Sequence, residues 1–147
     1  MITVDRGLPQ SSQRQVKRID IWWRGQENGS LMLILAYLLT HNHEWANHTV
    51  RVLRIVPEGQ DQRHATEELH SILYESRIKG AAVTVPLDGD LSNTLQTHSA
   101  DADVVFLGLT PPRENKEEAF YQQYAALVSG LPTTMLVCSA GEADLLI

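Results

Sequence analysis

The sequence predicts an α/β fold: a three-layer, doubly wound domain around a five-stranded parallel sheet. Three observations predict it. Short strand-like segments alternate with helix-like segments from residue 18 onward. The helix-like segments carry apolar residues at helical spacing. Two of the strand-like segments, residues 104–107 and 135–138, are almost wholly apolar, as expected for strands that are buried on both faces.

The first strand is predicted over residues 19–23, Ile-Asp-Ile-Trp-Trp, because β-branched and aromatic residues favour strands. Residues 28–30, Asn-Gly-Ser, offer a turn followed by an N-cap, so an apolar helix is expected to begin at Leu31. The second strand is expected over residues 49–56 and is closed by Pro57.

A polar helix is expected to begin at Asp61 and to end at residues 79–80, Lys-Gly, a common helix ending. Its apolar stripe faces a core and comprises Ala65, Leu69, Ile72, Leu73 and Ile78. The third strand is predicted over residues 81–85 and stops at Pro86.

The second half of the domain follows the same alternation. A helix is expected over residues 90–99, the fourth strand over 104–107, an amphipathic helix over 115–129 and the fifth strand over 133–138. Residues 5–17 are polar and show no apolar period. We therefore expect residues 1–17 to be a leader or linker and residues 18–147 to form the domain.

Right-handed crossovers restrict such a chain to a few topologies, and the flavodoxin-like order 3-2-1-4-5 is the one we predict. The strand order then reverses between the first and fourth strands. The loops at that edge are residues 24–29 and 110–115, and any ligand is expected there.

Composition excludes several classes of function. The net charge of −6 without a basic stripe argues against nucleic-acid binding. The longest apolar run, residues 31–39, is far shorter than the roughly 20 residues of a membrane-spanning helix. The first residues have no apolar core of a signal peptide, and a single cysteine suits a reducing compartment.

Residues with metal-binding or catalytic chemistry do not form a convincing site. His41, His43 and His48, with Glu44 between them, suggest a metal site, but three or four ligands must converge on one point and a His-x-His pair supplies two at most. Cys138 lies in a strand and is expected to be an inert thiol. The four aspartates between the third and fourth strands are expected to be caps and solvated charges; they are Asp88, Asp90, Asp101 and Asp103. We predict no enzyme, no cofactor and no metal.

The apolar run 31–39 is apolar on every side, although a helix on a sheet needs only one apolar stripe. The remaining surface is expected to be covered by another half-domain, a second copy or the membrane part of a carrier. The alternative is that the helix over 115–129 and the tail 140–147 cover it within one chain.

From about Arg18 to Val137 the sequence resembles the C-terminal cytosolic domain of the cation-chloride cotransporters, the Na-K-Cl and K-Cl carriers. The start, Asp-Ile-Trp-Trp followed by the apolar helix, is the specific part of the likeness. The matching segments are Ile19-Asp20-Ile21-Trp22-Trp23, Ala36-Tyr37-Leu38-Leu39, Trp45, Arg51-Val52, Leu69-His70-Ser71-Ile72-Leu73, Arg77-Ile78, Ala102-Asp103-Val104-Val105-Phe106-Leu107, Pro111-Pro112-Arg113, Leu131-Pro132 and Met135-Leu136-Val137.

The resemblance implies the second of two universal-stress-protein-like halves, on the cytoplasmic face of a membrane carrier. It implies a non-catalytic regulatory and assembly module whose partners are the membrane-embedded part and a second copy of the domain. Residues 87–101 are too short to hold the acidic insertion of the vertebrate carriers. Interface and rim candidates are Arg24, Ser30, Tyr37, Pro111, Pro112 and Arg113.

One alternative function remains open, a stand-alone universal-stress-like protein that binds an adenine nucleotide. Phosphate binding needs closely spaced glycines with free backbone N–H groups. Here Gly108 is followed by Pro111 and Pro112, which have no N–H to donate. The sequence therefore favours the carrier domain.

Overall fold

The computed structural model describes residues 2–4, 16–24, 26–110 and 114–139. The strands are β1 (Ile2–Val4), β2 (Lys17–Trp22), β3 (His48–Ile55), β4 (Ala81–Val85), β5 (Val104–Gly108) and β6 (Thr134–Val137). The helices are α1 (Gln26–Thr40), α2 (Gln62–Ser76), α3 (Leu91–Ser99) and α4 (Glu117–Val128), with a short 3-10 helix η1 (His43–Trp45).

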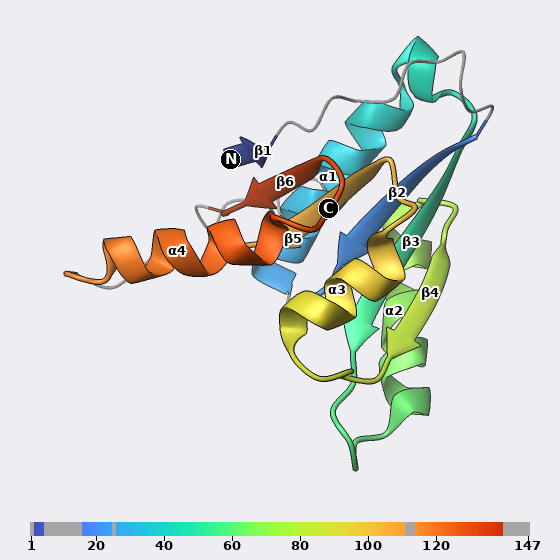
Figure 1. The fold of residues 1–147 in the computed structure, drawn as a ribbon. Helices are drawn as coiled ribbons and strands as arrows, with labels where there is room; N and C mark the ends of the chain where they lie inside the picture. The colour runs from blue at the N-terminus through green and yellow to red at the C-terminus, as the bar shows by residue number, and fades with distance from the viewer. Residues whose placement is uncertain (1, 5–15, 25, 111–113, 140–147) are drawn as a thin grey trace.

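The sheet order is β1-β6-β5-β2-β3-β4, and strands β2 to β6 are all parallel (Figure 1). Numbered without β1, this is the predicted order 3-2-1-4-5, which confirms the fold class. The central strand β2 places Ile21 between Val52 of β3 and Phe106 of β5, and all three side chains are fully buried.

Two features of the N-terminal part differ from the expectation. Ile2–Val4, which the sequence analysis placed in a leader, forms a short strand that pairs antiparallel with β6. The first parallel strand begins at Lys17, whose side chain is buried beside the ring of Trp45. The pattern missed β1 because three residues are too few to show a period.

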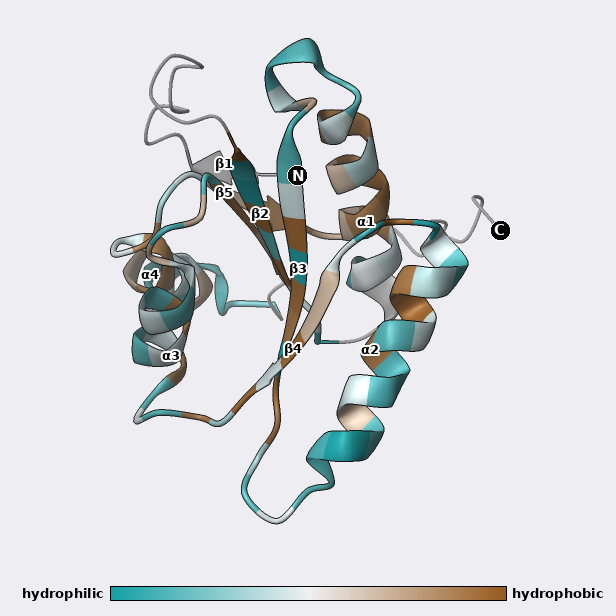
Figure 2. Cartoon of the chain, turned by 90° about the vertical axis from the view of Figure 1, so that its right-hand side faces the viewer, coloured by the Kyte–Doolittle hydropathy of each residue, from teal (hydrophilic) through white to brown (hydrophobic). Residues whose placement is uncertain are grey.

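Helices cover the sheet on both sides. Helices α1 and α2 lie on one face and α3 and α4 on the other (Figures 1 and 2). Side chains alternate along β2, so Ile19 and Ile21 pack with α1 and α2, whereas Trp22 packs with α3 and α4. The domain therefore has two separate cores, one on each side of the sheet.

Helix α1 begins at Gln26, not at Leu31 as predicted. Gly29 lies within the helix. A Cβ at this position would come 2.3 Å from the ring of Trp23. Glycine is thus required by the close approach of the indole and not by a turn.

Helix α2 was expected to begin at Asp61, which is its N-cap, and it ends at Ser76, earlier than predicted. Arg77 closes it in the left-handed conformation, with φ 58°. Gly80 lies beyond the helix, where a Cβ would approach the Val50 carbonyl oxygen to 2.8 Å. The glycine therefore serves close contact with β3 and does not cap the helix.

Candidate functional site

A groove of about 380 Å³ lies at the carboxyl edge of the sheet, on the side of α3 and α4. It includes the ends of β2 and β5, the predicted reversal point of the strand order. Its lining is Trp22, Trp23, Arg24, Arg54, Ile55, Pro57, Gln60, Leu87, Leu91, Leu95, Leu107, Gly108 and Leu127.

The groove is mostly apolar, and its polar groups are few. Arg54 is paired with Glu68 at 2.6 Å, so part of its charge is neutralised. Arg24 is exposed and makes no hydrogen bond or ion pair with another described residue. One free guanidinium at the mouth of an apolar groove provides general attraction for an anion but no built phosphate site.

Asn28 occupies the place next to Gly108 that a phosphate loop would need. Its amide nitrogen donates to the Leu109 carbonyl at 3.1 Å, and its side-chain oxygen accepts the Ser139 N–H at 2.8 Å. A Cβ on Gly108 would lie 3.0 Å from this side chain. The backbone groups at this edge are therefore used to join α1 to β5 and to the end of β6.

The predicted rim residues are dispersed. Arg24 lines the groove, Ser30 is half-buried inside α1, and Tyr37 lies further along α1 with 46% of its surface exposed. The range 111–113 (Pro-Pro-Arg) lies outside the described residues. Of the described candidates, Arg24 alone belongs to the groove.

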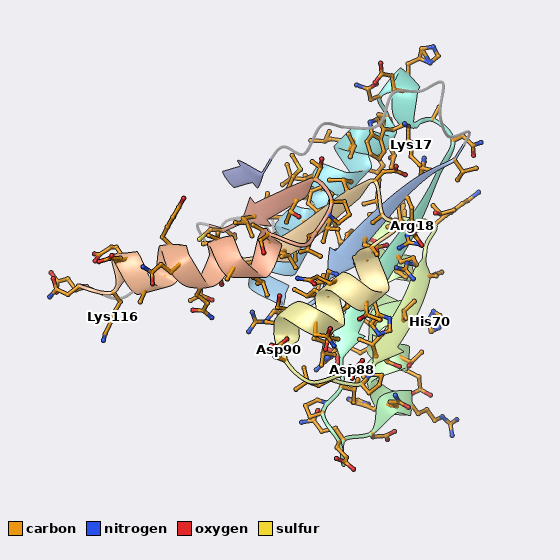
Figure 3. All side chains as sticks on the ribbon, viewed as in Figure 1. Lys17, Arg18, His70, Asp88, Asp90 and Lys116 are labelled. Carbon is orange, nitrogen blue, oxygen red and sulfur yellow. The ribbon has the colours of Figure 1, made fainter. Side chains whose placement is uncertain are left out.

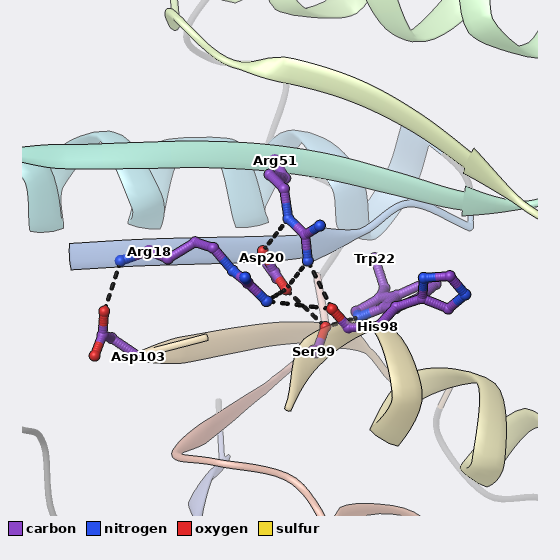
Figure 4. Close-up of polar contacts among 7 residues, drawn as sticks. All are labelled: Arg18, Asp20, Trp22, Arg51, His98, Ser99 and Asp103. Atoms are coloured by element: carbon purple, nitrogen blue, oxygen red, sulfur yellow. Dashed lines mark hydrogen bonds and ion pairs between the residues drawn. The ribbon is translucent and has the colours of Figure 1, made fainter. Parts of the chain in front are cut away.

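A polar cluster that the sequence analysis did not identify is built around Asp20, which is fully buried in β2 (Figure 4). Arg51 of β3 donates from Nε to Oδ1 at 2.9 Å and from Nη2 to Oδ2 at 2.7 Å. The Ser99 hydroxyl donates to Oδ2 at 2.8 Å and accepts the Trp22 indole N–H at 2.9 Å. The carboxylate is thus satisfied from β3 and from the end of α3.

Arginines also close the C-terminus of α3. The carbonyl of His98 accepts from Arg51 at 2.7 Å and from Arg18 at 3.2 Å, as suits cations at a helix C-terminus. The hydrogen bond to Asp20 raises the pKa of Arg51; burial opposes this rise, and the attraction of the two charges adds to it. Arg51 therefore carries its positive charge at neutral pH.

The chemistry of this cluster is structural. Asp20 has no exposed surface, and the Ser99 hydroxyl uses both its donor and its acceptor capacity inside the cluster. A general base must reach a substrate proton, and this carboxylate cannot. The sequence signal was a charged residue between Ile19 and Ile21 in a buried strand, which demands a buried partner.

Asp103, expected to be a cap or a solvated charge, is instead buried, and its carboxylate accepts the Arg18 backbone N–H at 2.7 Å. Several other titratable side chains that the sequence analysis considered make local contacts. Nδ1 of His41 lies 2.9 Å from the Tyr37 carbonyl oxygen, and Nδ1 of His48 lies 2.8 Å from that of Trp45. Asp90 caps α3 through the Asn93 N–H. Within the described part of the chain, no three His, Cys, Asp or Glu side chains come together in a way that could hold a metal.

The surface of α1 carries more apolar residues than its contact with the sheet uses. Met32, Leu33 and Ala36 are buried against the sheet. Leu38 is 59% exposed beside Tyr37, and Figure 2 shows α1 as predominantly hydrophobic. Helix α4 packs with α3 on the opposite face, so the expectation that it might cover α1 is wrong. The tail 140–147 lies outside the described residues.

Comparison with known structures identifies the class of fold. The structure is similar to a universal stress protein family member from Burkholderia pseudomallei, with a TM-score of 0.52 and 14% sequence identity. The match covers 82% of this chain and 94% of that one. The fold is therefore that of the universal stress proteins.

Comparison of sequences identifies the family. The model of solute carrier family 12 matches residues 8–90. The chain is 31% identical over 107 residues to potassium/chloride cotransporter 3 of Caenorhabditis elegans, and the match covers 69% of this chain and 10% of that protein. The chain belongs to solute carrier family 12, the cation-chloride cotransporters, and spans about a tenth of the length of this relative. None of the described helices is both long and apolar enough to cross a bilayer.

Proposed function

We propose that the chain is a non-catalytic regulatory and assembly domain on the cytoplasmic side of a cation-chloride-cotransporter-like carrier, acting through protein–protein contacts. Its partners are the membrane-embedded part of the carrier and a second copy of the domain. Membership of a transporter family supports this role, as does the small share of the relative's length that the chain spans.

The observation that carries the proposal is the outward face of α1. Tyr37 and Leu38 are exposed there, and Leu31, Ile34 and Leu35 are only partly buried. Contiguous exposed apolar surface of this kind marks a contact with another protein. The polar cluster around Asp20 also supports a non-catalytic role, because Asp20 and Ser99 are engaged in holding β2, β3 and α3 together.

A site-specific crosslinking experiment tests the α1 face. A photoreactive phenylalanine analogue replaces Tyr37 in the chain expressed in its source cell, and the crosslinked products are identified by mass spectrometry. The expected product is a carrier with about a dozen membrane-spanning helices. The matched control places the same analogue at Tyr121, an exposed tyrosine of α4 on the opposite face.

Crosslinks to the carrier from position 37 but not from position 121 support the proposal. Equal crosslinking from both positions, or none from either, contradicts it. Turnover of any substrate by the purified chain contradicts its non-catalytic part.

A further inference from the structure

The outer edge of β4 is unpaired within the described part of the chain. β4 pairs with β3 from Ala81 to Val85, and no other described strand contacts it. The Val56 N–H donates to the Val85 carbonyl at 2.9 Å, so Val85 directs its backbone groups toward β3. Because these directions alternate along a strand, the N–H and C=O groups of Ala82 and Thr84 point outward.

Between Ala81 and Val85 this edge lacks the features that usually prevent strand pairing, and Lys79 and Pro86 lie outside that stretch. Exposed edges in natural proteins are blunted by lysine, proline, bulges or very short strands. Residues 81–85, Ala-Ala-Val-Thr-Val, contain no charge and no proline, and they pair with β3 in an uninterrupted register. The opposite edge of the sheet is the three-residue strand β1. As far as the described residues go, the β4 edge is therefore open to a further strand.

Helix α2 lies beside the same edge. The hydroxyl of Thr66 lies 3.4 Å from that of Thr84, and Tyr74 lies in the last turn of the same helix. Tyr74 is 86% exposed, more than any other large hydrophobic residue of the described part, and Leu87 after β4 is 52% exposed. Figure 3 shows His70, between Thr66 and Tyr74, at the margin of the molecule beyond β4.

We infer that the β4 edge pairs with the β4 edge of a second copy of this chain, antiparallel about a two-fold axis at Val83. This inference rests on the proposed assembly role and names a surface for it that is separate from α1. In this register Ala82 lies opposite Thr84 of the second copy, and each outward N–H meets an outward C=O. A shift by one residue would place outward groups opposite inward ones and reverse the faces of the side chains.

The charges beside β4 favour a second copy over an unrelated strand. Lys79 precedes the strand and Asp88 follows it, and both are exposed. Antiparallel pairing about Val83 places Lys79 opposite Leu87 of the second copy, next to Asp88 of that copy, and the contact occurs twice by symmetry. Such an isologous contact requires a self-complementary surface. β4 meets this requirement because it carries a positive residue before the strand and a negative residue after it.

Disulfide crosslinking tests the register directly. In a Cys138→Ser background, Val83→Cys places two thiols directly opposite each other, where Cβ atoms are about 4.5–5.5 Å apart in such pairs. The matched control is Ala81→Cys, because the two copies of position 81 are separated by about 14 Å along the paired strands. We expect a crosslinked dimer from Val83→Cys under mild oxidation and none from Ala81→Cys.

A proline substitution tests the hydrogen bonds of the edge. Ala82→Pro removes an outward N–H and leaves the ladder with β3 intact, which is the position at which an edge strand tolerates proline. We expect the dimer dissociation constant measured by sedimentation to rise roughly tenfold or more. Circular dichroism of the variant checks that the fold is retained, and reversal of both charges in Lys79→Glu/Asp88→Lys should restore a dimer that either change alone weakens.

A chain that sediments as a monomer at every concentration overturns the inference. Equal crosslinking of Val83→Cys and Ala81→Cys also overturns it. A dimer that survives Ala82→Pro but is dispersed by Tyr37→Ser/Leu38→Ser overturns pairing through β4 while leaving the proposed function in place. Conversely, an unchanged β4 dimer without the α1 crosslink to the carrier overturns the proposed role of α1 and leaves pairing through β4 in place.

Discussion

Arg51 holds Asp20 in a side-on, two-point hydrogen bond, with Nε 2.9 Å from Oδ1 and Nη2 2.7 Å from Oδ2. The carboxylate is fully buried, whereas the guanidinium retains some contact with solvent. The same guanidinium also binds the His98 carbonyl at the end of α3. The Arg51 side chain therefore joins β3 to β2 and to the C-terminal end of α3.

Arg51→Met should lower the free energy of unfolding by about 3 kcal/mol, because a buried carboxylate loses its principal partner. The control on the same strand is Arg54→Met, which breaks an exposed pair with Glu68 and should cost under about 1 kcal/mol. Urea unfolding of both variants measures the difference. Similar losses of unfolding free energy in the two variants would show that the buried pair contributes no more to stability than the exposed pair.

The pH dependence of that difference follows from the sign of the shift. The pKa of Arg51 is raised above its ordinary value in the folded state, chiefly by its hydrogen bond to Asp20. The stabilisation it contributes is therefore complete below the unfolded pKa and is lost only as the pH rises through the folded one. The gap between wild type and Arg51→Met should stay constant from neutral pH to the onset of arginine titration.

Gly29→Ala should destabilise the domain although alanine is the better helix former. The added methyl group would overlap the Trp23 ring, which is held in the core. Overpacking of this kind costs about 1–3 kcal/mol. Ser30→Ala, at the next position of the same helix, should be neutral or slightly stabilising, and thermal unfolding of the pair separates the contact from helix propensity.

Arg77→Gly should raise stability by about 0.5–1 kcal/mol. Arg77 ends α2 with φ 58°, a conformation that glycine adopts without the steric cost of a Cβ. The neighbouring change Lys79→Gly is the comparison, because Lys79 lies beyond the helix. A fall in the unfolding midpoint for Arg77→Gly would mean that the arginine side chain makes a contribution larger than its backbone strain.

Calorimetric titration with ATP and Mg²⁺ should give no saturable heat. The N–H of Ser139 is taken by Asn28, whose amide nitrogen also donates to the Leu109 carbonyl beside Gly108. Asn28→Gly is the informative variant, because it frees these groups next to Gly108. Saturable binding by the unaltered chain would favour the nucleotide-binding alternative.

Strand order was predictable because each strand is bounded by glycine, proline or polar residues and each crossover has one handedness. The start of α1 was not, since Asn28, Gly29 and Ser30 have the composition of a turn. Gly29 is in a helix for the sake of Trp23, a contact that local sequence does not encode. Propensity is overridden here by tertiary packing.

A groove lies at the point where the strand order reverses, where the sequence analysis expected any ligand, but the chemistry of this groove was not predictable. Rim candidates chosen by position separated into Arg24 at the groove and Tyr37 on another surface. Asp20 was visible as a charge in an apolar strand, yet its partners Arg51 and Ser99 lie far along the chain. Pairing at such separations depends on strand register, which a single sequence does not specify.

The two margins of the sheet differ, and that difference limits how large an assembly can grow. A contact that uses the same margin on both molecules consumes it, and what remains at either end is the three-residue β1. In the proposed pairing through β4, growth then stops after one step, which would give a closed pair and not a fibre.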